Sequence, residues 1–141
     1  MNPEKSSMKK QAEQWLHFAY VDLRSAKKLR EDKDLTQVAA FHIHQCVEKS
    51  IKAILEYKDQ KTPKIHNLVL LTELVRKLGI DPSEGEDILD EINQVYIESR
   101  YPADLGLLPG GIPSAETIEK FIEFAINLYN FTEKMINEGS S

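Results

Sequence analysis

Six charged or imidazole side chains occur in the chain at places where they can hold an anion or move a proton. They are Asp22, His44, Glu48, Lys52, His66 and Arg100. Carboxylates and imidazoles serve as general acids and bases, and the arginine fork binds phosphate through two parallel hydrogen bonds. These groups act together only if the fold brings them together, so the elements that carry them decide what they can do.

The histidines offer little to a metal ion. His42 and His44 are two positions apart, and on a helix this spacing turns their side chains roughly 200° from one another. His44 and Glu48 are four apart and share a face. No third ligand is marked by its spacing, so we predict a hydrogen-bonded pair and no metal site.

Motifs for nucleophilic or phosphate-loop chemistry are missing from the sequence. There is no G-x-S-x-G, no Walker loop and no G-x-G-x-x-G, and the glycines of LLPGGIP have no preceding strand. The single cysteine, Cys46, lies in no CxxC pair and is expected to pack as a small hydrophobe. A net charge of −5 argues against broad nucleic-acid binding through the phosphate backbone. No cofactor is predicted.

Helical periodicity runs through most of the chain and predicts an all-α fold. Apolar residues recur at helical spacing at about 8–30, 35–57, 67–78, 83–99 and 114–136, and no alternating run is long enough for a paired strand. We predict an antiparallel up-and-down bundle of about five helices in one domain, residues 1–141, with frayed ends at about 1–7 and 138–141. No apolar run reaches a membrane span, so a cytoplasmic location without membrane contact is expected.

Three helix starts are marked by capping residues. Asn67 or His66 is predicted to cap the third helix, and Ser114 the fifth. Ser83, with Glu86 three residues on, has the pattern of a capping box for the fourth.

Asp22 and Arg100 are charged side chains whose interaction partners have to be identified. Asp22 lies on the core side of the first helix, and a buried carboxylate needs a partner. Arg100 stands near the end of the fourth helix, where the macrodipole favours a cation and Pro102 enforces the stop. Arg100 either pairs with Asp22 or Glu48, or faces a cleft and binds phosphate. The spacing leaves both interpretations open.

The segment after Arg100 is long for a connection inside a helical domain. It carries apolar side chains whose burial is favourable, and we expect them to pack on the bundle or on a partner chain. They are Leu105, Leu107, Leu108 and Ile112.

The stretches FHIHQCVEKSIKAIL, IHNLVLL and ESRYPAD, in this order, resemble the HEPN family (higher eukaryotes and prokaryotes nucleotide-binding domain). The resemblance spans nearly the whole chain. It implies a bundle of four to five helices, a homodimer, and a gene beside a minimal nucleotidyltransferase. In such modules the HEPN protein often acts as a toxin ribonuclease, and other members bind nucleotides. The matching positions are Gln45, Glu48, Lys49, Lys52, His66, Asn67, Arg100, Tyr101 and Pro102.

Two departures from the family pattern bear on catalysis. Ribonuclease members of the family resemble one another in an Arg and a His that are separated by four to six residues. In this chain the corresponding positions after Arg100 hold Leu105, Gly106 and Leu107. Family members with this motif also tend to have an acid directly after the Pro. In this chain Ala103 lies between Pro102 and Asp104.

We therefore predict a non-catalytic, dimeric HEPN protein that binds a nucleotide, serves as partner of a minimal nucleotidyltransferase, or both. Phosphate and cleft contacts are assigned to Arg100, Tyr101, Lys52 and His66, with Asp22, His44, Glu48 and Asp104 in support. One rival is a metal-independent RNA endonuclease toxin with His44 or His66 as its base. Another is a structural dimerisation module in which Arg100 is an ion-pair partner.

Overall fold

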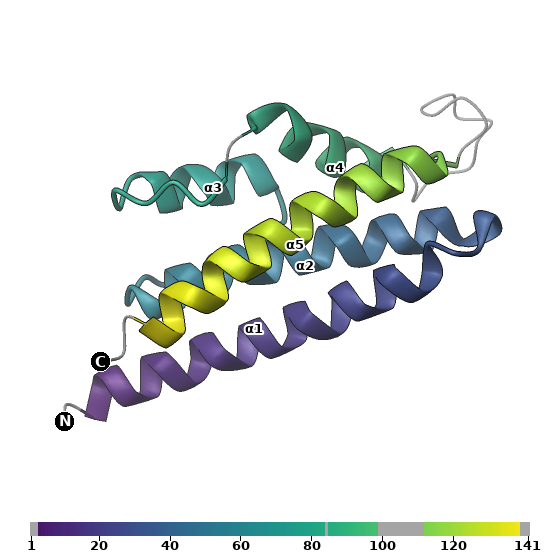
Figure 1. Ribbon diagram of the computed structural model, residues 1–141. Coiled ribbons are helices and arrows are strands. Elements are labelled where there is room, and N and C mark those ends of the chain that lie inside the picture. Colours follow the sequence, from purple (N-terminus) through teal and green to yellow (C-terminus); the bar gives the residue numbers. More distant parts are fainter. Residues whose placement is uncertain (1–2, 84, 99–111, 139–141) are drawn as a thin grey trace.

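Three long helices lie side by side along the length of the molecule (Figure 1). They are α1 (Pro3–Leu29), α2 (Thr36–Tyr57) and α5 (Ala115–Glu138). Two shorter helices, α3 (Leu68–Arg76) and α4 (Glu86–Glu98), pack against α2 on the side away from α1 (Figure 1). A 3-10 turn, η1 (Lys33–Leu35), joins α1 to α2.

The computed structural model describes residues 3–83, 85–98 and 112–138, with side chains from residue 8 onward. Within these residues there are helices and connections but no strand, so the predicted all-α bundle is confirmed. Helix α1 begins at Pro3, earlier than expected, and proline is well suited to the first position of a helix. None of the described helices combines the length and apolar character that a membrane span requires.

A stripe of alanines lets α1 approach α2 closely. Ala12, Ala19 and Ala26 are seven residues apart and fully buried. Two helical turns separate successive alanines, so all three lie on one face. Leu16 and Leu23 lie between them and are also buried. Small side chains at these positions bring α1 and α2 into contact along their length.

Helix α2 is the centre of the bundle and contacts every other helix. Ile43, Val47, Ile51 and Ile54 share one face of α2 at helical spacing, and all four are fully buried. Cys46 is buried as well, and burial raises the pKa of its thiol to about 12. The interpretation of Cys46 as a small core residue is therefore confirmed.

The connection from α2 to α3 turns back along α2. Thr62 donates a hydrogen bond to Glu56 Oε2 (2.6 Å) in the last turns of α2. His66, at the end of the connection, reaches Glu48, which lies well before Tyr57 at the end of α2. The chain thus returns toward the middle of α2 before α3 begins.

Helices α3 and α4 form an antiparallel pair. The backbone N–H of Leu68, at the start of α3, donates to Asn93 Oδ1 in α4 (3.0 Å). Arg76, at the end of α3, donates to Glu86 at the start of α4 (2.9 Å). Figure 1 shows that α4 runs opposite to α2, so α3 runs in the same direction as α2. The helices therefore do not alternate in direction between α2 and α3, because the connection between them returns along α2.

Two of the predicted helix caps are formed. Asn67 Oδ1 accepts hydrogen bonds from the backbone N–H groups of Val69 (3.0 Å) and Leu70 (3.2 Å). Ser114 Oγ accepts one from the backbone N–H of Thr117 (3.1 Å). Each cap satisfies donors that the first turn of a helix leaves unpaired.

The predicted capping box at Ser83 is wrong. Helix α4 begins at Glu86, directly after Gly85 with φ +123°, so Ser83 does not stand at the start of the helix. Ser83 Oγ has no hydrogen-bond partner in the described part of the chain. The Glu86 carboxylate, which the box would have used, binds Arg76 instead.

Asn93 ties α4 to the start of α3. Its Oδ1 accepts from Leu68 N–H, its Nδ2 donates to Asn67 Oδ1 (3.0 Å), and the residue is buried. Asn93→Ala leaves a buried N–H unpaired, so we expect the free energy of unfolding in urea to fall by about 2 kcal/mol. Asn127→Ala, on the exposed side of α5, should change it by less than about 0.5 kcal/mol. Equal effects of the two substitutions would contradict this role.

Candidate functional site

A buried carboxylate, that of Glu48, lies at the centre of the predicted polar set. Glu48 is 3% exposed. Its Oε2 accepts a hydrogen bond from Lys52 Nζ (2.9 Å), and its Oε1 lies 3.0 Å from His66 Nδ1 and 3.8 Å from His44 Nδ1. We call these four residues the Glu48 cluster. A charge is stable in such a place only when it is paired and hydrogen-bonded.

Lys52 is directed into the protein. It lies one turn after Glu48 on α2, is 5% exposed, and has its ammonium 5.6 Å from the centre of the Trp15 ring on α1. Both contacts favour a cation at this position. Lys52 was predicted to contact phosphate, whereas the structure places its charge beside the Glu48 carboxylate, which it neutralises.

His66 is the exposed member of the Glu48 cluster. Its side chain is 66% exposed, although its Nδ1 is held by both oxygens of Glu48, at 3.0 and 3.2 Å. The next residue, Asn67, caps α3 and is held by Asn93. The main chain beside His66 is therefore anchored while one side of its ring faces solvent.

His44 is enclosed between α2 and α4. It is 1% exposed, and its ring stacks on Tyr96 of α4 with the centroids 3.8 Å apart and the planes 16° from parallel. Burial lowers the pKa of His44 to about 4, although the nearby Glu48 carboxylate opposes this effect. His44 is thus a neutral packing residue near pH 7.

Asp22 belongs to a different cluster, at the seam between α1 and α2. It is buried and paired with Lys49 Nζ (2.7 Å) and His42 Nδ1 (2.9 Å). The prediction that this carboxylate needs partners is confirmed. So is the divergence of the two helix α2 histidines, since His42 faces α1 and His44 faces α4.

Three predicted site residues, Arg100, Tyr101 and Asp104, lie outside the described residues, and their role stays a prediction. The described part of α4 ends at Glu98, just before them, and its last turns contact the Glu48 cluster through Tyr96. The motif thus follows directly on a helix that packs against the cluster.

Asn93 and Tyr96 were not predicted as site residues. Both follow Leu89 at helical spacing, four and seven residues on, and so share its buried face. A polar amide on such a face needs hydrogen-bond partners, and this was the signal that could have identified Asn93.

Outside the two clusters, the described residues include a solvent-open hollow beside Trp15. Across residues 3–83, 85–98 and 112–138, no three His, Cys, Asp or Glu side chains are grouped to hold a metal ion. The hollow, of about 300 Å³, is open to solvent and shares Trp15 with the surroundings of Lys52. It is lined by Gln11, Gln14, Trp15, Phe18 and Glu56.

The helical fold agrees with the comparisons with known proteins. The family model of the HEPN domain matches residues 12–135, and the chain belongs to this family. The crystal structure of TT1696 from Thermus thermophilus is similar, with a TM-score of 0.67 and 24% identity over 88% of this chain and 97% of that one. At this identity the likeness shows the fold alone. No curated protein matches the chain significantly.

The buried, neutral His44 makes stability depend on pH. Its pKa is about 4 in the folded chain and 6.5 in the unfolded one, so between these values only the unfolded chain takes up the proton. The free energy of unfolding should therefore fall as pH drops from 6.5 to 4, by about 3 kcal/mol in total, and be unaffected by this group above pH 6.5.

Urea denaturation at pH values from about 7.5 down to about 4 measures this dependence. His44→Leu should remove this part of the slope, whereas His17→Leu, at an exposed site on α1, should retain it. An unchanged slope in His44→Leu would contradict the assignment.

Proposed function

We propose that this HEPN protein binds a nucleotide at the open side of the Glu48 cluster and acts with a minimal nucleotidyltransferase in a two-component module. One observation carries the proposal. His66 is anchored to a buried carboxylate yet exposed, beside the helix that leads into Arg100-Tyr101-Pro102. Exposed polar groups held by a buried scaffold are typical of ligand sites.

Arg100 is assigned to the phosphate. The two acids that the sequence offered as its ion-pair partners already have cationic partners, since Asp22 pairs with Lys49 and Glu48 with Lys52. This supports a ligand contact over an internal ion pair. Tyr101 and His66 line the cleft, and Lys52 contributes by neutralising Glu48, with Asp104 as a further polar group.

Membership of the HEPN family supports the assignment of partners. We propose a homodimer, which is common among HEPN domains, and a nucleotidyltransferase encoded nearby. The transferase would act as the antitoxin-like component. This proposal rests on the family and on the RYP motif.

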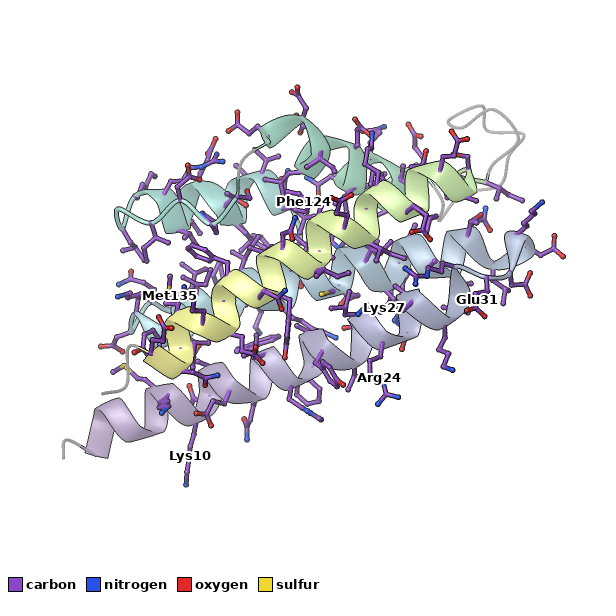
Figure 2. The ribbon with its side chains drawn as sticks, in the orientation of Figure 1. Lys10, Arg24, Lys27, Glu31, Phe124 and Met135 are labelled. Carbon is purple, nitrogen blue, oxygen red and sulfur yellow. The ribbon has the colours of Figure 1, made fainter. Side chains whose placement is uncertain are left out.

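Isothermal titration with ATP, GTP, AMP and GMP, with and without magnesium, tests the nucleotide site. We expect binding by the native chain and at least about tenfold weaker binding by Arg100→Ala, because a bidentate charge-assisted contact is lost. Arg24→Ala is the control, since Arg24 is exposed on α1 and points away from the bundle (Figure 2). Absence of heat with every nucleotide would refute the nucleotide site.

A metal-independent RNA endonuclease is the second candidate, and one of its two proposed bases is better supported than the other. His44 is enclosed, whereas His66 is exposed and hydrogen-bonded to a carboxylate in the manner of a general base. If the protein cleaves purified tRNA, His66→Ala should abolish cleavage and His17→Ala should not. Intact tRNA after prolonged incubation with the native protein would exclude this activity.

A further inference from the structure

We propose that His66 accepts a hydrogen bond from a ribose hydroxyl of the bound nucleotide, and that Glu48 is the positioning residue that prepares it to do so. The inference rests on the proposed function and adds the part of the nucleotide that His66 contacts. It follows from the proton that Glu48 places on the imidazole ring.

The contacts of Glu48 determine the tautomer of the neutral His66 ring. An ionised carboxylate only accepts hydrogen bonds, and its two oxygens lie 3.0 and 3.2 Å from His66 Nδ1. The proton of the neutral imidazole is therefore on Nδ1, and Nε2 carries the lone pair. A carboxylate behind a histidine has this orienting effect in many protein sites.

Glu48 is held in its acceptor role by its surroundings. Lys52 Nζ donates to Oε2 at 2.9 Å, and Trp15 covers the ammonium from α1. At 3% exposure the carboxylate has little access to a ligand, so its influence on one passes through His66.

The backbone next to His66 limits the freedom of the ring. Asn67 caps α3 through two backbone N–H groups, and Asn93 Nδ2 donates to the same Asn67 oxygen at 3.0 Å. The imidazole is thus fixed at one nitrogen and anchored through its main chain. Its other nitrogen is presented to solvent with little further ordering required on binding.

A lone pair at Nε2 selects a ligand group that donates a hydrogen bond. Phosphate oxygens are acceptors, so a lone pair at Nε2 does not favour them. The donors of a nucleotide are its ribose hydroxyls and the N–H groups of its base. The hydroxyls are common to ATP and GTP, so we assign His66 to the ribose.

The tautomer is tested first, without any nucleotide. Long-range ¹⁵N–¹H correlation spectra at mildly alkaline pH should show the Nδ1–H form of His66 in the native chain. Glu48→Met/Lys52→Met replaces the ion pair by apolar side chains of similar length, and should shift the ring toward the Nε2–H form. Lys52→Met, which keeps the acceptor, should retain the Nδ1–H form. Circular dichroism verifies that each variant is folded, and an Nε2–H form in the native chain overturns the proposal.

The contact itself is tested by titration with ATP, 2′-deoxy-ATP and 3′-deoxy-ATP. In the native chain at least one deoxy analogue should bind about tenfold more weakly than ATP, because His66 Nε2 is left without its hydrogen-bond donor when the hydroxyl is missing. In His66→Ala the penalty for that analogue should disappear.

The outcomes separate the two proposals. ATP binding with equal affinity for both analogues, or a penalty that persists in His66→Ala, overturns the ribose contact and leaves the nucleotide site standing. A loss of affinity in His66→Ala for GTP but not ATP assigns the ring to the base and also overturns the ribose contact. Absence of ATP binding overturns both.

Discussion

The buried carboxylate of Glu48 is the constraint on which the packing of α2, α3 and α4 depends. An ionised group at 3% exposure is stable only if cations and hydrogen-bond donors reach it. One partner, Lys52, comes from the next turn of the same helix, and another, His66, comes from the connection before α3. The polar cluster and the path of the chain from α2 to α3 are therefore parts of one arrangement.

Helix α4 stabilises this arrangement from the other side. Asn93 holds the first residues of α3, and Tyr96 stacks on His44 of α2. Helix α4 thus holds the backbone next to His66 and also packs against the Glu48 cluster through Tyr96. The same helix leads into the Arg-Tyr-Pro motif, so a displacement of α4 would affect the cluster and the motif together.

Helical periodicity was sufficient to predict the fold class and most local features. The 3.6-residue repeat determines which residues of one helix share a face, and from it followed the divergence of His42 and His44. The caps at Asn67 and Ser114 were also predictable, because a cap is formed by residues only two or three positions apart. Family membership followed from the order of three motifs.

The sequence by itself determined which side chains are available, and the tertiary structure decided which of them meet. Glu48 and His66 are 18 positions apart, and their contact depends on a connection that turns back along α2. Local spacing carries no information about such a turn, because its direction is set by packing between helices. For the same reason, the contact of Lys52 with Trp15 and the contact of Asn93 with Leu68 are decided by the packing of α1, α2, α3 and α4.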